Sequence, residues 1–218
     1  MIFLRSETEL RSEILEAGKR IYAKGMVASN DGNISCRLEN GNILITPTGV
    51  CKGDMINEQL LVVDMNGNII TGSMKPTSEM KMHLAVYRMR QDVGAVVHAH
   101  PQKATAFTVV GIGLDKITLP EVVFSLKRIT LVPYGTPSTV EIPQAIEKHI
   151  MDSNALLLSN HGALTVGNSP LDAYFNMETL EHFASITLYA RQLGRENTLD
   201  ELQIQRLFEV RKDVFGKA

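Results

Sequence analysis

Segments typical of strands and segments typical of helices alternate along the whole chain, and two pairs of strand-like segments are joined by Asn-Gly. Asn-Gly is a strong hairpin signal, because both central residues of a type I′ turn need a positive φ. A hairpin joins antiparallel strands, so the chain is expected to build a sheet that is at least partly antiparallel. The two hairpins are expected at Ile34–Leu38 with Ile43–Pro47, and at Leu60–Asp64 with Asn68–Thr71.

Further strands are indicated by apolar, β-branched runs, and helices by capping motifs ahead of apolar residues at helical spacing. Capping boxes of the form Ser/Thr-x-x-Glu begin at Ser6, Ser138 and Thr198, and Pro101 and Pro170 suit first helical positions. The additional strands are expected at Val93–His98, Ile129–Pro133, Ala155–Ser159 and Ala163–Val166. The helices are expected from Ser6 to Gly25, over Glu79–Arg90, from Pro101 toward Val110, from Ser138 to about Ile150, from Ser169 to about Leu193, and from Thr198.

The 218 residues contain no linker, low-complexity run or internal repeat, which predicts a single three-layer α/β domain over residues 1–218. Lys and Arg number 22 and Asp and Glu number 24, so the net charge of −2 provides no field for nonspecific nucleic-acid binding. Trp is absent and aromatic residues make up 6%, which argues against a platform for stacking bases. No nucleic-acid partner is therefore expected.

The protein is expected to act in the cytoplasm, without a membrane partner. No segment has the ~18 consecutive apolar residues needed to cross a bilayer, and the N-terminus turns acidic at once instead of forming a signal-peptide core. The two cysteines, Cys36 and Cys51, are too few for a disulfide framework and are expected to be ordinary buried thiols.

Two histidines lie two residues apart at the end of an apolar strand, in G-A-V-V-H-A-H. Side chains at i and i+2 of a strand face the same way, roughly 7 Å apart at their Cα atoms. His98 and His100 therefore suit a single metal ion, although a hydrogen-bonded pair without metal is the alternative for so short a motif.

A third histidine, His161, follows another apolar strand in L-L-L-S-N-H-G. Gly162 allows an unusual backbone or a close approach at that turn. Three protein ligands and an open position are the pattern of a catalytic rather than a structural zinc. The other histidines, His83, His149 and His182, fall in amphipathic helices and are interpreted as core-edge or surface residues.

Glu79 is a natural carboxylate partner, because it follows the hydroxyl residues Thr77 and Ser78 at a helix start, where free N–H groups attract anions. The polar turns at residues 31–33 and 46–49 also have N–H donors for phosphate oxygens. The alternatives are an ordinary capped helix start with an acidic residue near the dipole, and two common turns.

The ordered motifs G-N-I-S, I-T-P-T-G, K-P-T-S-E-M-x-x-H, V-V-H-A-H-P, V-P-Y-G-T and S-N-H-G resemble the class II aldolase/adducin family. The resemblance covers roughly residues 7 to 195 and is closest to the branch of L-fuculose-1-phosphate aldolases. It implies a central, largely antiparallel sheet with helices on both faces. It also implies a homotetramer with active sites at subunit interfaces and a small sugar phosphate as substrate.

The resemblance assigns a role to each matching residue. His98, His100 and His161 match the ligands of one divalent metal ion per subunit, with zinc the first choice and manganese or cobalt as alternatives. Glu79 matches the carboxylate that binds the metal at rest and becomes the catalytic base. The positions that match the phosphate-binding residues are Gly32, Asn33, Thr48, Gly49, Thr77 and Ser78.

One departure from the family pattern concerns the proton donor for the departing aldehyde. The fuculose-phosphate aldolases use a tyrosine there, and Phe124 falls at the position expected to match it. No tyrosine lies between Tyr87 and Tyr134, and the C-terminal tail contains none. Glu121, Ser125 or a water molecule are the candidate replacements.

The predicted reaction is the metal-dependent, reversible cleavage of a ketose 1-phosphate into dihydroxyacetone phosphate and a short aldehyde. The ketose would be fuculose 1-phosphate or a 5-deoxypentulose 1-phosphate, whose methyl group suits an apolar Phe124. The family also contains ribulose-phosphate 4-epimerases, a methylthioribulose-1-phosphate dehydratase, decarboxylases and noncatalytic adducin-type modules. The epimerases carry Asp at the Glu79 position and rely on a tyrosine, so an aldolase is favoured, with the epimerase and the dehydratase as alternatives.

Overall fold

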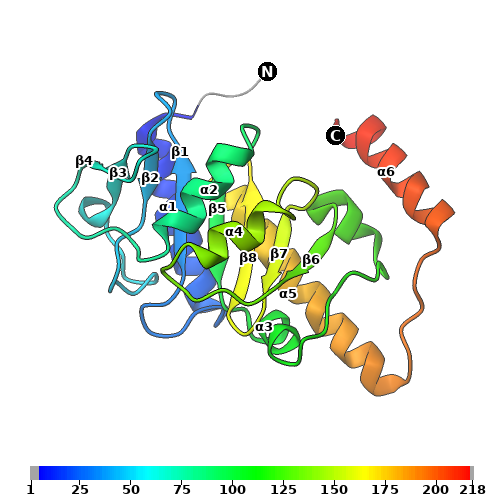
Figure 1. The fold of residues 1–218 in the computed structure, drawn as a ribbon. Coiled ribbons are helices and arrows are strands. Elements are labelled where there is room, and N and C mark those ends of the chain that lie inside the picture. Colours follow the sequence, from blue (N-terminus) through cyan, green and yellow to red (C-terminus); the bar gives the residue numbers. More distant parts are fainter. Residues whose placement is uncertain (1–4, 217–218) are drawn as a thin grey trace.

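The computed structural model describes residues 5–216, and an eight-stranded sheet lies at the centre of that part of the chain (Figure 1). Its strand order is β4-β3-β2-β1-β5-β8-β7-β6. Every neighbouring pair is antiparallel except β6 and β7, which are parallel, so the largely antiparallel sheet expected from the sequence is confirmed. The strands are β1 Asn33–Arg37, β2 Ile43–Ile45, β3 Leu61–Val63, β4 Ile69–Thr71, β5 Ala95–Ala99, β6 Ile129–Val132, β7 Ala155–Leu158 and β8 Gly162–Gly167.

Helices cover both faces of the sheet, and each face has its own apolar cluster. One cluster joins the sheet to α1, α3 and α5, and the other joins it to α2 and α4. This arrangement confirms the predicted three-layer α/β architecture. The α-helices are α1 Glu7–Ala23, α2 Met80–Met89, α3 Gln102–Val109, α4 Glu141–Glu147, α5 Pro170–Leu193 and α6 Glu201–Phe215, with a 3₁₀ turn η1 at Asn57–Gln59 and a π-helix η2 at Val122–Leu126.

The capping box at Ser6 is confirmed, since its hydroxyl accepts a hydrogen bond from the Glu9 N–H and the Glu9 carboxylate returns to the Ser6 backbone. The box expected at Ser138 is wrong: α4 begins at Glu141, whose N–H is bonded to the Thr139 hydroxyl instead. Ser138 has φ +67 and lies outside the helix. The helix ends at Glu147, three residues before the expected end.

The start of α6 is also corrected. The sequence predicts a box at Thr198, but Asp200 caps the helix and exchanges hydrogen bonds with Gln203. A carboxylate is a better N-cap than a threonine hydroxyl, which explains the shift of two residues. Pro101 is the N-cap of α3 rather than its first residue, because its extended ψ of 130 precedes the helix.

Alternation along β1 prepares the functional site. Ile34 and Cys36 enter the cluster that α1 and α5 cover, so Asn33 and Ser35 lie on the opposite face, under α2. In the pairing with β5, Asn33 stands directly opposite His98. A polar residue of β1 and a histidine of β5 are thereby neighbours on one face of the sheet.

Both cysteines are free thiols, and Cys36 is buried as expected, whereas Cys51 is only partly buried. Burial raises the pKa of the Cys36 thiol well above its usual range. Among the helices of residues 5–216, none is both long enough and apolar enough to span a bilayer.

Candidate active site

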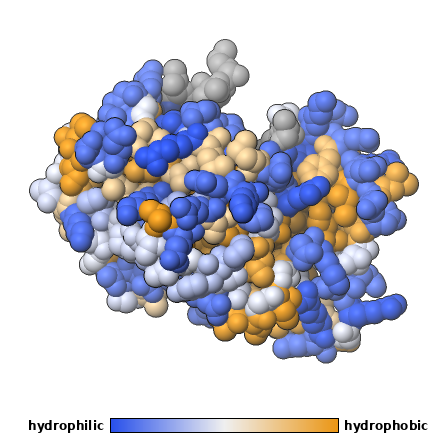
Figure 2. All heavy atoms as spheres, in the orientation of Figure 1, coloured by the Kyte–Doolittle hydropathy of each residue, from blue (hydrophilic) through white to orange (hydrophobic). Residues whose placement is uncertain are grey.

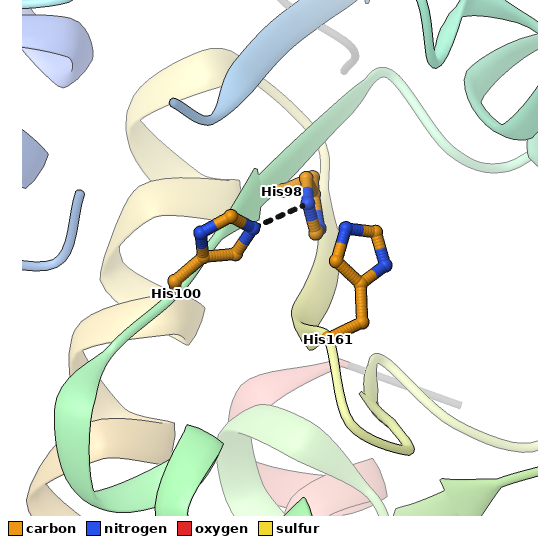
Figure 3. Close-up of side chains that lie close together, drawn as sticks. All are labelled: His98, His100 and His161. Atoms are coloured by element: carbon orange, nitrogen blue, oxygen red, sulfur yellow. Dashed lines mark hydrogen bonds between the residues drawn. The ribbon is translucent and has the colours of Figure 1, made fainter. Parts of the chain in front are cut away.

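Three histidines from two neighbouring parts of the sheet meet at one edge of the molecule (Figure 3). His98 is the penultimate residue of β5, His100 directly follows the strand, and His161 lies in the turn between β7 and β8. One potential ligand atom of each lies within 4.8 Å of the others, and the Nε2 atoms of His98 and His100 are 3.2 Å apart. The three residues that the sequence singled out are therefore brought together.

The buried His98 has a fixed ring orientation. Its Nδ1 lies 2.9 Å from the carbonyl oxygen of Ala163, and a carbonyl can only accept a hydrogen bond. Nδ1 therefore carries a proton, and Nε2 is left facing the other two rings. A ring nitrogen held in this way by a backbone carbonyl is typical of histidines that bind metal ions.

Glu79, the residue before α2, completes the cluster. Its Oε2 is 3.1 Å from His98 Nε2, and its Oε1 is 3.3 Å from His161 Nε2. At this distance a proton or a metal cation must lie between His98 Nε2 and the carboxylate oxygen. Within residues 5–216, the buried Oε1 of Glu79 and Nδ1 of His161 also lack a hydrogen-bond partner. Three imidazole nitrogens and a carboxylate fit a divalent transition metal.

The charge states agree with this interpretation. Burial, together with the neighbouring His98, lowers the pKa of His161 to about 4, and burial is also the main cause that lowers the pKa of His100. Burial opposes ionisation of Glu79, but His98 and a hydrogen bond from Asn33 hold its pKa well below the usual range. The shifts of His100 and His161 favour uncharged imidazoles and that of Glu79 favours an ionised carboxylate, which are the protonation states that a metal requires.

A chain of hydrogen bonds orients the carboxylate of Glu79. Asn33 donates from its Nδ2 to Glu79 Oε2 at 3.0 Å, and its Oδ1 accepts from His83 Nε2. The other nitrogen of His83 lies 2.7 Å from the Ser35 hydroxyl, which lies 2.8 Å from that of Tyr87. Each donor has one acceptor along this chain, so the carboxylate has a fixed direction.

His83 is the residue that the sequence interpretation placed wrongly. It was expected at the core edge or the surface, but it is fully buried, and burial lowers its pKa to about 3. The available signal was its spacing of four residues from Glu79, which puts both at the same side of a helix start. His149 is half-buried and His182 is exposed, so the interpretation of those two is confirmed.

The six residues predicted to bind phosphate lie in three loops that the backbone ties together. Thr48 N–H donates to Lys75 O at 3.0 Å, and Thr77 N–H donates to Thr46 O at 3.1 Å, so two loops run side by side. The third reaches them through the bond from Asn33 to Glu79. Thr48, Gly49 and Ser78 are exposed, Gly32 is partly buried, and Thr77 and Asn33 are buried.

Two glycines are needed where the backbone passes close to the histidines. A Cβ on Gly162 would lie 2.5 Å from His100 Cδ2, so this glycine allows the close approach expected from the sequence. Gly32 has φ +75, and a Cβ there would lie 2.6 Å from Val27 Cγ1. In the N-H-G turn, the left-handed residue is Asn160, with φ +55.

Asp31 is a further neighbour that sequence reasoning did not select, with its Oδ2 3.6 Å from His100 Nδ1. Its place directly before Gly32 was a usable signal, because that turn ends beside the strand that carries His98. Phe124 lies in the π-helix η2, an element that the sequence analysis did not anticipate.

Curated relatives share most of the chain. L-fuculose phosphate aldolase of Methanococcus maripaludis is 36% identical over 183 residues, which cover 84% of this chain and 98% of the relative. The 3-oxo-tetronate 4-phosphate decarboxylase of Escherichia coli K12 is 35% identical over 189 residues, which cover 84% and 88%. The chain is thus similar to two enzymes with different reactions.

The fold leads to the same group of proteins. A solved structure of L-fuculose 1-phosphate aldolase superposes with a TM-score of 0.88 at 26% identity, covering 95% of this chain and 98% of that one. The model of the class II aldolase and adducin N-terminal domain matches residues 12–188, which include every residue of the histidine cluster and the three loops. The chain belongs to the class II aldolase and adducin N-terminal domain family.

Proposed function

We propose that this protein is a divalent-metal-dependent aldolase that reversibly cleaves a ketose 1-phosphate into dihydroxyacetone phosphate and a short aldehyde. L-fuculose 1-phosphate and a 5-deoxypentulose 1-phosphate are the candidate substrates. The observation that carries the proposal is a largely buried carboxylate 3.1 and 3.3 Å from two imidazoles, one of which has its other ring nitrogen bonded to a backbone carbonyl. The aldolase relative at 36% identity supports the same reaction.

His98, His100, His161 and Glu79 would hold the metal, with zinc as the first choice and manganese or cobalt as alternatives. When bound, a divalent ion supplies Lewis-acid stabilisation of the negative charge that develops on the oxygens of a ketose as its carbon–carbon bond breaks. The remaining steps depend on the residues of the chain.

Glu79 is proposed to move the proton. As the C3–C4 bond breaks, the C4 hydroxyl loses a proton and leaves as the aldehyde, and the enediolate of dihydroxyacetone phosphate needs one proton at C3. Glu79, protonated with the proton that the C4 hydroxyl released, returns it there. In the direction of synthesis, Glu79 removes that proton. Asn33 keeps the carboxylate oriented through both steps.

The phosphate group is proposed to lie in the three tied loops. Gly49 has φ +74 and is exposed, and it lies beside the equally exposed Thr48 in a turn whose N–H groups suit phosphate oxygens. Ser78, one residue before Glu79, completes the set on the second loop. The remaining predicted residues of the phosphate site are Gly32, Asn33 and Thr77.

A second candidate is the decarboxylation of a 3-oxo acid phosphate, as in the relative from E. coli. Loss of CO₂ from 3-oxo-tetronate 4-phosphate breaks the bond to the carboxylate carbon and leaves the same enediolate, which one proton converts to dihydroxyacetone phosphate. A departing CO₂ needs no proton donor, so this reaction fits a chain with Phe124 where the aldolases use tyrosine.

Product analysis separates the two reactions. The zinc-loaded protein would be incubated with a panel of ketose 1-phosphates and with 3-oxo-tetronate 4-phosphate, and dihydroxyacetone phosphate, aldehyde and CO₂ would be measured. An aldolase releases aldehyde with the triose phosphate in equal amounts. Release of CO₂ with the triose phosphate and without aldehyde identifies the decarboxylase. A new ketose phosphate or a dehydrated sugar phosphate, without triose phosphate, identifies the epimerase or the dehydratase.

The active site is proposed to lie at an interface of a homotetramer. Exposed apolar residues gather at the end of α3, where Val109 and Val110 are 60% and 64% exposed, and Figure 2 shows apolar side chains over this region. Thr108 O accepts a hydrogen bond from Asn160 N–H, so the patch adjoins the turn that carries His161. An apolar patch beside a catalytic site is typical of a subunit contact.

Light scattering tests the assembly. We expect a tetramer in the wild type, and we expect Val110→Lys to dissociate it and lower activity, while Lys148→Met, a change at an exposed site, leaves both unchanged. A monomer that is fully active at working concentration contradicts the proposal.

A further inference from the structure

A second polar cavity lies at the other end of the sheet, far along β5 and β8 from the histidines. Its volume is about 340 Å³, within the range of small-molecule sites. Val93, just before β5, and Gly167, at the end of β8, form part of its wall, whereas His98 is the penultimate residue of β5 and His161 precedes β8. The cavity is therefore separate from the proposed active site.

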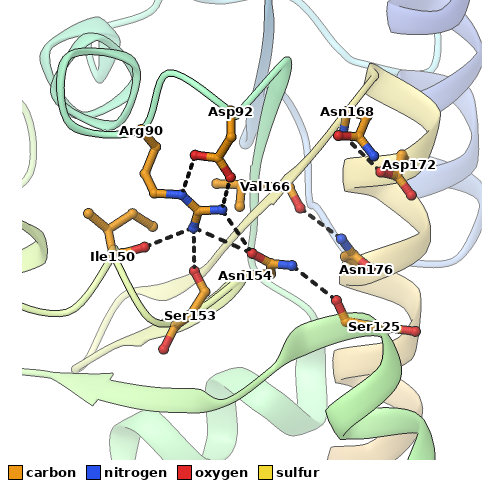
Figure 4. A network of polar contacts seen from close by, with 10 residues as sticks. All are labelled: Arg90, Asp92, Ser125, Ile150, Ser153, Asn154, Val166, Asn168, Asp172 and Asn176. Carbon is orange, nitrogen blue, oxygen red and sulfur yellow. Dashed lines mark hydrogen bonds and ion pairs between the residues drawn. The ribbon is translucent and has the colours of Figure 1, made fainter. Parts of the chain in front are cut away.

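Positive side chains from three elements line this cavity: Arg90 after α2, Lys127 after η2 and Arg211 on α6. Two carboxylates are also present, and one of them, Asp92, is paired with a cation. Asp92 receives both of its hydrogen bonds from Arg90 at 2.6 and 2.9 Å, and Asp172 accepts from the Asn168 N–H at 2.8 Å (Figure 4).

Arg90 is a structural residue in this network. Its guanidinium also donates to the carbonyl oxygens of Ile150 and Ser153 and to the side chain of Asn154, so its donors are used within the protein. It ties the end of α2 to the start of β7, and it keeps a positive charge at the wall of the cavity.

Lys127 is different. Its Nζ has no hydrogen bond or ion pair with any residue in 5–216, although the side chain is half-buried. Arg90 and Arg211, whose Nε donates to Phe124 O, lie near it, and so do the carboxylates of Asp92 and Asp152. Burial, and then repulsion from the two guanidiniums, lowers the pKa of Lys127. Arg90 is paired with Asp92, whereas the Lys127 ammonium has no carboxylate within ion-pair distance among residues 5–216, so an anion would neutralise its charge.

The backbone at Lys127 is also strained. It has φ +62 and ψ −70, and the Arg128 N–H bonds to Leu126 O at 2.7 Å, which closes a rare γ-turn. The π-helix η2 ends directly before this turn. A strained residue after a π-helix is a frequent feature of ligand sites, where the strain holds a side chain in place.

We propose that this cavity binds a small anion, a phosphate ester or a carboxylate, with the Lys127 ammonium as its main charged contact. Arg90 and Arg211 lie beside it, and Ser125 and Asn168 lie at the wall within the same polar surface. The bound anion would lie among residues of η2, α5 and α6.

Calorimetric titration of the metal-loaded full chain with inorganic phosphate and with sulfate, at constant ionic strength, tests the proposal. Lys127→Met should weaken one binding event at least about tenfold, as expected for the loss of a charge-assisted hydrogen bond. The matched control Lys148→Met and the active-site variant Ser78→Ala should leave that event unchanged. The proposal is overturned if Lys148→Met weakens anion binding as much as Lys127→Met does, or if no binding event depends on Lys127.

A glycine variant at Lys127 provides an independent test. Lys127→Gly relieves the strained φ, so without anion its Tm should rise by about 2–4 °C, while the rise in Tm on adding phosphate should shrink. A Tm gain from phosphate that equals that of the wild type contradicts the site.

Discussion

The residues of the proposed active site could be predicted where their spacing in the sequence has few explanations other than a shared site. His98 and His100 two apart on a strand, and His161 beside Gly162, indicated one cluster, and the structure places their side chains together. His83 was not predictable in the same way, because a histidine in an amphipathic helix most often has no special role. Its function depends on Asn33, which is 50 residues away in the chain and becomes its partner only through the fold.

Glu79→Gln tests the proposed base. The amide is nearly isosteric, so the fold and much of the metal affinity should remain, while cleavage and exchange of the C3 proton of dihydroxyacetone phosphate should fall by about 10²–10⁴-fold. Proton exchange in heavy water is the measurement, because it needs no aldehyde. Glu121→Gln is the control at the next candidate carboxylate, which is exposed, and it should exchange like the wild type. If Glu121→Gln lost proton exchange and Glu79→Gln kept it, Glu121 would be the base.

Lys52 predicts a pH effect on stability. Its side chain is 1% exposed, and its Nζ donates to Val50 O at 2.6 Å and to Asn30 O at 3.1 Å. Burial lowers its pKa from 10.5 to about 8. Between these values the unfolded chain binds more protons than the folded one, so this group makes the protein more stable as pH rises from about 8 toward 10.5.

The measurement for Lys52 is the free energy of unfolding in urea at pH 7.5, 8.5 and 9.5. Lys52→Met should lower stability at every pH because it leaves two carbonyls without a partner. It should also remove a positive slope of up to about 1.4 kcal/mol per pH unit, which the control Lys148→Met should keep. Parallel slopes in the two variants would show that Lys52 does not titrate in this range.

Secondary-structure elements followed the sequence closely where the signal was local. The Asn-Gly hairpins and the box at Ser6 are confirmed. The boxes at Ser138 and Thr198 failed because several capping residues compete within a few positions, and the choice depends on where the helix packs. The π-helix η2 has no sequence signature, since its pattern of apolar residues also fits an α-helical turn.

The cap of α6 can be tested by a matched pair of variants. Asp200→Ala removes the acceptor for the Gln203 N–H, so it should destabilise the protein by about 1 kcal/mol, or lower Tm by about 2–4 °C. Thr198→Ala, two residues earlier, should change stability little. Thermal unfolding of both proteins gives the comparison. If Thr198→Ala lowered Tm as much as Asp200→Ala, Thr198 would contribute to the cap, as the sequence predicted.

At the scale of the whole molecule, the sequence predicted the three layers and the antiparallel character of the sheet, but not the order of its strands. Hairpins define neighbours only locally, whereas β5 lies between β1 and β8 through long-range pairing. This central position is what joins the three loops to the histidines. The proposed metal would therefore connect parts of the chain that lie far apart in the sequence.

Metal removal should therefore lower the stability of the entire protein. The chelated protein should unfold at a lower temperature than the zinc-loaded protein, by an amount that grows with free zinc concentration. Elemental analysis should find about one metal per chain in the wild type and in His182→Ala, and nearly none in the double variant His100→Ala, His161→Ala. Full occupancy in that double variant would rule out the cluster as the metal site.

The pairing of Asn33 with His98 limits how this enzyme can change over evolution. A shift of β1 by one residue would exchange its two faces, turning Asn33 and Ser35 toward the apolar layer and Ile34 toward Glu79. Such a chain would lose its polar chain of contacts and its core packing at the same time. A mutation that shifts this strand would therefore lower stability and activity together.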